Sequence, residues 1–166
     1  MADYRELLDK ALRKEDFYRF PKFTQDNVLE LAQDLIESCK DFRGPLALEI
    51  DLAGVMVFRY YPTGTGGHNE MWLNRKRRTV SLLQKSSLRV SAELGVNGED
   101  IEKDLYLNPM EYASCGGGFP IRLQSGNLVG FIGASGLTDV EDHNAIIGGL
   151  DRYFRRNFGE LYEGAE

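Results

Sequence analysis

The chain has 166 residues, of which 42% are hydrophobic and 28% are charged, as in an ordinary globular domain with a buried core. Its formal net charge of -6 at pH 7 argues against broad binding to a phosphate backbone, because that affinity comes from lysine and arginine. No apolar run is long enough to span a bilayer, and the charged N-terminus lacks the apolar stretch of a secretory signal. We therefore expect one cytoplasmic domain over residues 1–166, without a nucleic-acid or membrane partner.

The first segment predicts an amphipathic helix over residues 3–15, which Pro21 keeps from continuing. An aromatic strap surrounds this proline. It contains Phe17, Tyr18, Phe20 and Phe23. We expect the strap to pack on the body of the domain or on another subunit. Because large exposed apolar areas mark interfaces, it predicts a homo-oligomer with the strap or Trp72 at a subunit contact.

A second helix is expected to begin at Thr24 or Asp26, either of which can cap its first turn. Two strands follow at residues 46–52 and 55–61, and Ala53-Gly54 between them predicts a hairpin turn. The predicted organisation is an N-terminal helix and strap over 1–23, a core over 24–158 and a tail over 159–166.

Helical periodicity returns from Asn69 to about Val96, with a bend near Ser86-Ser87 and Gly95 as the predicted C-cap. Residues 97–112 are expected to be polar connectors with short helical turns. Two more strands are predicted, at residues 119–123 and 128–134. The turn between them contains Ser125-Gly126-Asn127.

The last helix is expected to begin near Thr138, with Glu141 completing a capping box. Two antiparallel hairpins separated by helices must share one sheet to bury their apolar faces. The predicted fold class is therefore α/β (α+β), with one antiparallel sheet covered by helices. We expect Ile146, Leu150 and Phe154 to pack on that sheet.

Four stretches taken together indicate a family. They are Trp72-Leu73-Asn74-Arg75-Lys76 with Ser86-Ser87 beyond it, Gly116-Gly117-Gly118-Phe119-Pro120-Ile121, Ser135-Gly136-Leu137, and Glu141-Asp142-His143. In this order they resemble a cytoplasmic branch of the heme-degrading-domain superfamily. That superfamily includes glycolate-operon accessory proteins, haem-binding sensor proteins and the C-terminal domain of some corrinoid adenosyltransferases. The resemblance covers about Val28 to Phe154.

The resemblance implies a three-layer, profilin-like sandwich and homo-oligomeric members. It also implies haem or a cobalamin-like molecule as the ligand of some relatives. No haem-ligating residue of those relatives matches a position in this chain, so haem enters by resemblance alone and the cofactor stays open. The word "degrading" carries no activity over to this chain.

Three groups of residues are candidates for a ligand site. Arg75 and Lys76 belong to the one dense basic cluster, which suits either an anionic ligand or salt bridges between subunits. Gly116, Gly117 and Gly118 form either a structural turn or a loop whose amides hold an anion. Ser135 and Gly136 precede a helix N-terminus, which favours a carboxylate or phosphate, although capping explains them equally well.

The two histidines, His68 and His143, are weak candidates for metal ligands. Residues Glu141, Asp142 and His143 diverge by about 100° each on a helix, so all three cannot converge on one ion without a ligand from elsewhere, for which His68 is a candidate. Cys39 and Cys115 lack the spacing of a metal or redox motif and are expected to be free thiols.

The preferred hypothesis is a homo-oligomeric module that binds a small anionic ligand between the Arg75/Lys76 helix, the Gly116 loop and the Ser135 turn. An assembly protein without a small ligand is the alternative. An enzyme acting on a tetrapyrrole or a small metabolite is a third hypothesis. No nucleophile elbow, P-loop or zinc pattern supports it.

Overall fold

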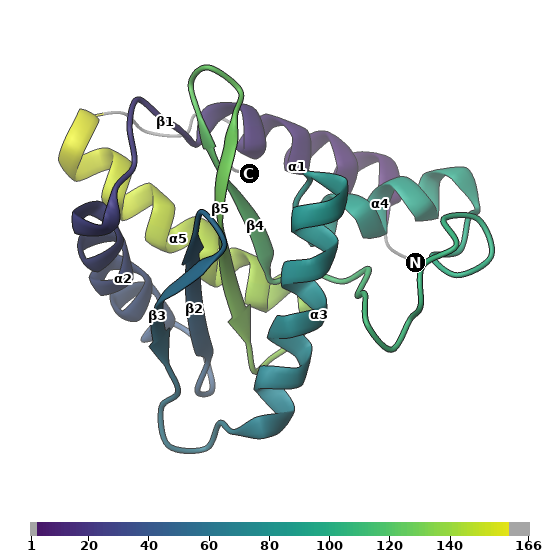
Figure 1. Cartoon of the computed structure of the whole chain (residues 1–166), viewed down its shortest axis with the longest axis horizontal. Helices are drawn as coiled ribbons and strands as arrows, with labels where there is room; N and C mark the ends of the chain where they lie inside the picture. The colour runs from purple at the N-terminus through teal and green to yellow at the C-terminus, as the bar shows by residue number, and fades with distance from the viewer. Residues whose placement is uncertain (1–2, 160–166) are drawn as a thin grey trace.

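The computed structural model describes residues 3–159, and within them five helices surround one five-stranded sheet (Figure 1). In chain order, the elements are α1 (Tyr4–Phe17), β1 (Arg19–Phe20), α2 (Gln25–Cys39), β2 (Ala47–Leu52), β3 (Val55–Tyr60), α3 (Gly67–Leu83), α4 (Ser87–Asn97), β4 (Gly118–Leu123), β5 (Leu128–Ser135) and α5 (Asp139–Phe158). None of these helices is long and apolar enough to cross a membrane.

The strand order is β1-β4-β5-β2-β3. Both predicted hairpins, β2–β3 and β4–β5, therefore lie in a single sheet, as expected from the sequence. They meet through the antiparallel pairing of β2 with β5, whereas the short β1 adds to β4 in parallel. This pairing brings the C-terminal end of β5 next to the start of β2, where Ser135 lies opposite Ala47.

Helices cover both faces of the sheet, which confirms the three-layer arrangement (Figure 1). Helices α2 and α5 pack on each other and on one face, and α3 crosses the other face over β5 and β4. Helices α1 and α4 pack together beside the sheet. Ile146, Leu150 and Phe154 of α5 are buried, as predicted.

The aromatic strap belongs to the core of its own chain. Tyr18, Phe20 and Phe23 are buried, and the Phe20 ring lies 5.1 Å from the Phe154 ring. Of the two placements expected for the strap, the structure shows packing on the body of the domain. The strap is therefore not the predicted subunit contact, and Trp72 is left as the other candidate for it. The reason is β1, whose pairing with β4 places Phe20 under α5. Burying such a side chain fully stabilises the fold by about 2–3 kcal/mol.

The long helical stretch divides at the predicted bend. Helix α3 ends at Leu83, and its C-cap Gln84 has a left-handed backbone conformation. The Ser86 hydroxyl caps α4 by accepting the Arg89 N–H. The predicted C-cap at Gly95 is wrong, because α4 continues to Asn97 and Gly98 caps it. Gly95 instead lies against the ring of Tyr4. Of the predicted tail, residues 160–166 lie outside the described residues.

Candidate functional site

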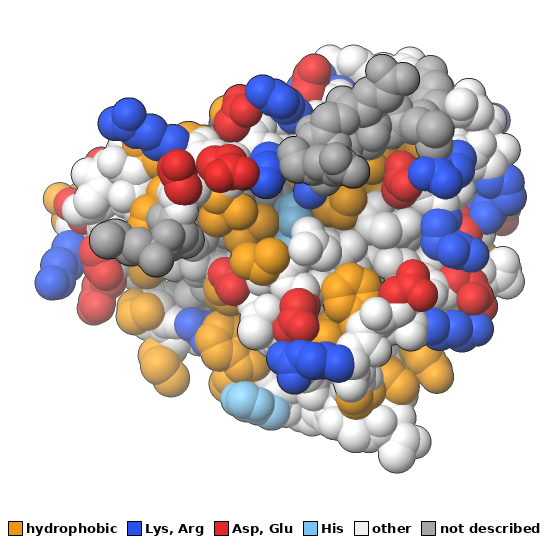
Figure 2. Space-filling view, turned by 180° about the vertical axis from the view of Figure 1, so that it is seen from behind, with side chains coloured by type: hydrophobic (Ala, Val, Ile, Leu, Met, Phe, Trp, Pro, Cys, Tyr) orange, Lys and Arg blue, Asp and Glu red, His pale blue; other side chains and the backbone are white. Residues whose placement is uncertain are grey.

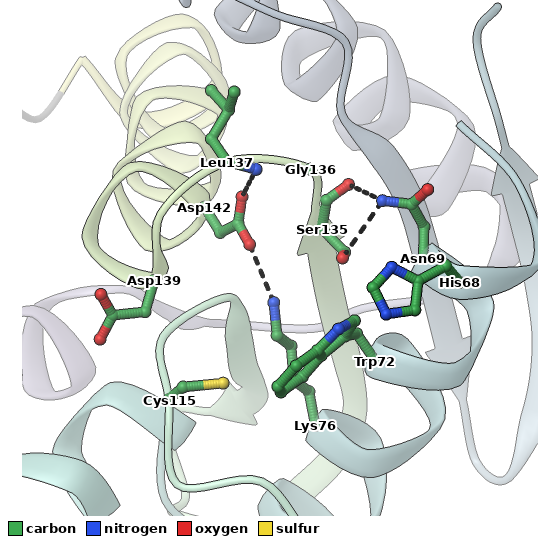
Figure 3. Close-up of a pocket in the computed structure, with 10 residues that line it drawn as sticks. All are labelled: His68, Asn69, Trp72, Lys76, Cys115, Ser135, Gly136, Leu137, Asp139 and Asp142. Carbon is green, nitrogen blue, oxygen red and sulfur yellow. Dashed lines mark hydrogen bonds and ion pairs between the residues drawn. The ribbon is translucent and has the colours of Figure 1, made fainter. Parts of the chain in front are cut away.

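A cleft of about 290 Å³ lies between the first half of α3, the end of β5 and the first turn of α5 (Figure 3). Its volume is at the lower end of the range for small-molecule sites, roughly 300–1,000 Å³. The cleft is lined by His68, Asn69, Trp72, Lys76, Cys115, Ser135, Gly136, Leu137, Asp139 and Asp142.

One wall of the cleft comes from a single face of α3. His68, Trp72 and Lys76 follow one another at intervals of four residues, which places them on one side of the helix. The guanidinium of Arg75 lies 4.2 Å from the centre of the Trp72 ring, and the His68 ring stands edge-on to Trp72 at 6.4 Å. The indole is therefore held in place by two neighbours from its own helix.

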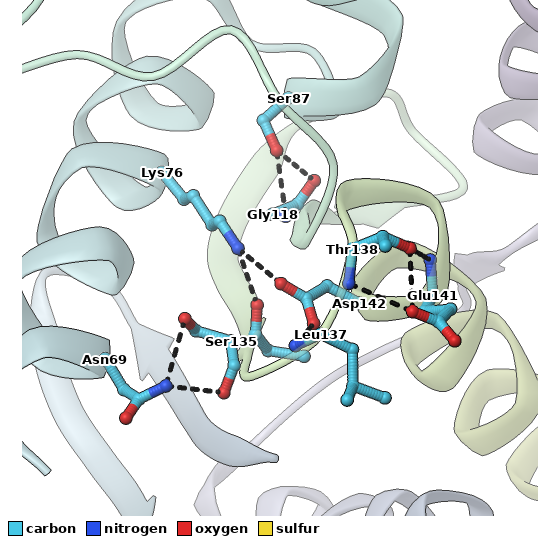
Figure 4. Close-up of polar contacts among 10 residues, drawn as sticks. Asn69, Lys76, Ser87, Gly118, Ser135, Leu137, Thr138, Glu141 and Asp142 are labelled. Carbon is cyan, nitrogen blue, oxygen red and sulfur yellow. Dashed lines mark hydrogen bonds and ion pairs between the residues drawn. The ribbon is translucent and has the colours of Figure 1, made fainter. Parts of the chain in front are cut away.

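The floor is a buried ion pair between α3 and α5. Lys76 Nζ lies 2.9 Å from Asp142 Oδ2, and the two side chains are only 3% and 4% exposed. Lys76 also donates to the carbonyl of Ala134 at 2.9 Å, and Asp142 Oδ1 accepts the Leu137 N–H at 2.9 Å (Figure 4). Burial raises the pKa of the Asp142 carboxyl, and the Lys76 ammonium opposes that shift. The pair joins three segments that are distant in the sequence.

Asn69 fixes the opposite corner of the cleft. Its amide donates to the backbone carbonyl of Ser135 at 3.2 Å, and its Oδ1 accepts the Gly66 N–H at 3.0 Å. The start of α3 is thereby tied to the end of β5. Ser135 itself is buried, with its hydroxyl at the cleft surface.

Cys115 lies at the edge of the cleft as a free thiol, and Cys39 is free as well, as predicted. Burial raises the pKa of the Cys115 thiol, and it raises that of Cys39 to about 12. Both residues are therefore protonated at neutral pH, so neither side chain is an activated nucleophile.

The basic cluster does not act as one unit. Lys76 lines the cleft, but Arg75 points elsewhere and donates to the carbonyl of Pro109 at 2.6 Å. Arg77 donates to Asn74 at 2.9 Å, and Arg78 is exposed. Because successive residues of a helix diverge by about 100°, adjacent positions cannot share one site. The expectation that Arg75 and Lys76 face one cleft is wrong for Arg75.

The three glycines of the 116–118 loop are buried beneath the cleft rather than on its lining. A Cβ at Gly116 would meet the carbonyl of Asp139, and one at Gly117, where φ is +110°, would meet the carbonyl of Ala134. The N–H of Gly118 donates to the Ser87 hydroxyl at 2.9 Å. This hydrogen bond explains the Ser86-Ser87 motif. The loop is therefore close-packed, and its Gly118 amide is used within the fold.

The histidines occupy different environments. His68 is exposed at the cleft, whereas His143 is 1% exposed and neither ring nitrogen has a hydrogen-bond partner in the described structure. Burial lowers the pKa of His143 to about 3. Within residues 3–159, no group of three or more His, Cys, Asp or Glu side chains is arranged to hold a metal ion.

Six lining residues were not among the candidates proposed from the sequence. They are Asn69, Trp72, Cys115, Leu137, Asp139 and Asp142. The four-residue spacing of His68, Trp72 and Lys76 is a signal that would have brought Trp72 into it. Asp142 had no comparable signal, because its partner lies 66 positions away.

These features define a three-layer α/β domain with a cleft at the C-terminal end of its central strand, β5. Residues 23–151 match the family described as haem degrading protein HbpS-like, and the chain belongs to this family. The chain is 33% identical over 134 residues to UPF0303 protein SCO2848 from Streptomyces coelicolor, which covers 81% of this chain and 85% of that protein.

Solved structures agree with this fold. The crystal structure of the Ybr137w protein superposes with a TM-score of 0.82 at 24% identity, over 90% of this chain and 88% of that one. A crystal structure of a PduOC complex with haem gives a TM-score of 0.64 at 17% identity, over 77% and 92% of the two chains. At these identities the likeness shows the fold alone.

Proposed function

We propose that this protein is a binding module for a small organic molecule held in the cleft between α3 and α5. The observation that supports this most strongly is unused hydrogen-bonding capacity beside an aromatic wall. Lys76 uses two of its three N–H groups, and within residues 3–159 the Trp72 indole and the Ser135 hydroxyl donate to no acceptor. An indole face beside three such donors suits a planar molecule that carries an oxygen acceptor.

Haem, which the family description implies, does not fit the residues present. Haem carries two propionates, and each carboxylate needs a cationic or hydrogen-bonding partner when it leaves water. Among the described lining residues Lys76 is the one Lys or Arg, and Asp142 already pairs with it. The cavity of about 290 Å³ is also small for an enclosed macrocycle. We therefore assign haem no role in this cleft.

Fluorescence of Trp72, the single tryptophan, tests the proposal directly. The purified protein is titrated with benzamide, benzoate, phenyl phosphate and, separately, haemin. We expect a saturable change in Trp72 emission with at least one of the three small probes and none with haemin. Ser135→Ala should weaken the affinity for that probe about five- to tenfold, because one hydrogen bond is lost.

Ser81→Ala is the matched control, since Ser81 is an exposed serine of α3 away from the cleft. It should keep the wild-type affinity. If no small probe gives a saturable response, or if Ser135→Ala binds as tightly as Ser81→Ala, the proposed function is wrong. A saturable response to haemin that Ser135→Ala weakens would overturn the exclusion of haem.

A homo-oligomer whose assembly is the function is the second candidate, and exposed apolar side chains favour it. Arg75 holds the 108–112 loop next to Trp72, and on that loop Met110 is 77% exposed. Tyr106 is 88% exposed and Met71 41%. Figure 2 shows hydrophobic side chains gathered beside a histidine on the lower part of one face. Sedimentation velocity at micromolar concentration tests this: a defined oligomer that Met110→Ser weakens supports it, and a wild-type monomer contradicts it.

A further inference from the structure

The Lys76–Asp142 pair presents a hydrogen-bond donor and an acceptor side by side at the floor of the cleft. From this we infer that the cleft selects uncharged planar carboxamides or lactams over anions of the same shape, and that Asp142 sets this selectivity. The inference rests on the proposed function, since it names the ligand class of the same cleft. It also replaces the anionic ligand expected from the sequence.

The first argument is the charge at the floor. The ammonium of Lys76 and the carboxylate of Asp142 lie 2.9 Å apart and are both almost fully buried. A ligand anion beside them would meet a positive and a negative charge at similar distances, so their effects nearly cancel. Moving that anion out of water would then have little compensation, and ions are expensive to bury without a partner.

The second argument is the N-terminus of α5, which was expected to offer free amides to an anion. Side chains of the same helix end already occupy three of them. The Leu137 N–H donates to Asp142 at 2.9 Å, and the Thr138 N–H donates to Glu141 Oε2 at 3.0 Å (Figure 4). The Glu141 N–H donates to the Thr138 hydroxyl at 3.3 Å. Three carboxylates, including Asp139, fill this first turn, so the positive end of the helix dipole is already neutralised.

The third argument is the complementarity of the pair itself. A protonated lysine has three donors, and Lys76 has one left after Ala134 and Asp142. A carboxylate has about four acceptor positions. Asp142 uses two of them, for Lys76 and for the Leu137 amide, so it keeps acceptor capacity for a ligand N–H. One donor beside one acceptor matches the carbonyl and N–H of a carboxamide, while the flat remainder of the ligand lies against Trp72.

The test compares three probes that differ only in the group on a phenyl ring: benzamide, benzoate and phenyl phosphate. Affinities are measured by Trp72 fluorescence for the wild type, Asp142→Asn and Asp26→Asn. Asparagine at 142 keeps an oxygen for the Leu137 N–H but removes the charge, so Lys76 is left uncompensated. Asp26→Asn removes one negative charge from the first turn of α2, far from the cleft lining, and controls for net charge.

We expect the wild type and Asp26→Asn to bind benzamide at least tenfold more tightly than benzoate or phenyl phosphate. Asp142→Asn should reverse the order, with benzoate gaining at least tenfold. If wild-type protein binds benzoate as tightly as benzamide, the inference is wrong and the proposed function survives. An unchanged order in folded Asp142→Asn refutes the role of Asp142. If Asp142→Asn does not fold, the wild-type order decides. If no probe binds, the proposed function fails and takes this inference with it.

Discussion

Removing Lys76 should destabilise the protein far more than removing an ion pair of similar length on its surface. In Lys76→Met, Asp142 keeps its charge in a site where its side chain is 4% exposed, and the carbonyl of Ala134 loses its donor. Breaking a buried pair in this way costs about 3–5 kcal/mol. With a urea dependence of about 2 kcal/mol per molar, the unfolding midpoint should fall by roughly 1.5–2.5 M.

Lys40→Met is the matched control. Lys40 lies 2.6 Å from Glu37, but the two side chains are 64% and 47% exposed. Water screens such a pair, so the midpoint should hardly move. The double variant Lys76→Met/Asp142→Leu should recover most of the lost stability, because no buried charge is left without a partner.

The pH dependence of Lys76→Met gives an independent check. Lys76 lowers the pKa of the Asp142 carboxyl against the raising effect of burial, so its loss moves that pKa further above the value in the unfolded chain. A carboxyl with a raised folded pKa loses stability as the pH rises through that pKa. Lys76→Met should therefore be closer to wild type at pH 5 than at pH 8. Equal midpoints for Lys76→Met and Lys40→Met, or a double variant no more stable than Lys76→Met, would refute this reasoning.

Three further predictions concern the surroundings of the cleft. Because His143 is buried with a pKa of about 3, the unfolded state takes up its proton first. The free energy of unfolding of the wild type, relative to that of His143→Leu, should fall by about 1.4 kcal/mol per pH unit as the pH is lowered from 6 to 3.5. Urea midpoints that change equally with pH in the two proteins would contradict this. Gly117→Ala should cost roughly 2–5 kcal/mol, because its Cβ meets backbone at positive φ. Gly126→Ala, at φ +97° in open space, should cost only about 1–2 kcal/mol in the same assay, and equal losses would count against close packing at Gly117. Arg75→Ala should speed hydrogen exchange of the 108–113 amides, and exchange no faster than in Arg78→Ala would show that Arg75 does not hold the loop.

Local patterns predicted the elements whose determinants are close together in the chain. The turn at Ala53-Gly54 and the capping box of Thr138 and Glu141 involve neighbours within a few residues, and both were placed correctly. The short β1 had no such signal, since two residues carry no periodicity and Arg19 pairs with Arg122. Without β1, the sequence left open whether the strap packs on its own domain or on another subunit, and the structure places it in the core of its own chain.

The candidate site was predicted only in part, for the same reason. Lys76, Ser135 and Gly136 do line one cleft, although a ligand there stays a prediction. The sequence suggested both Arg75 and Lys76 as partners of a ligand, but helix geometry sends Arg75 to the 108–112 loop. The positive charge of Lys76 looked available in the sequence because Asp142 is distant along the chain. Only the fold shows that they neutralise each other.

A titration of the ¹⁵N-labelled protein with benzamide, followed by NMR, tests the central claim most directly. The indole N–H of Trp72 and the backbone amides of residues 135–137 should shift together with one saturating curve. The amides of the β4–β5 turn around Gly126, which does not line the cleft, should stay in place. Saturable shifts confined to residues away from the α3–α5 cleft, or no shifts at all, would contradict a ligand site between these helices.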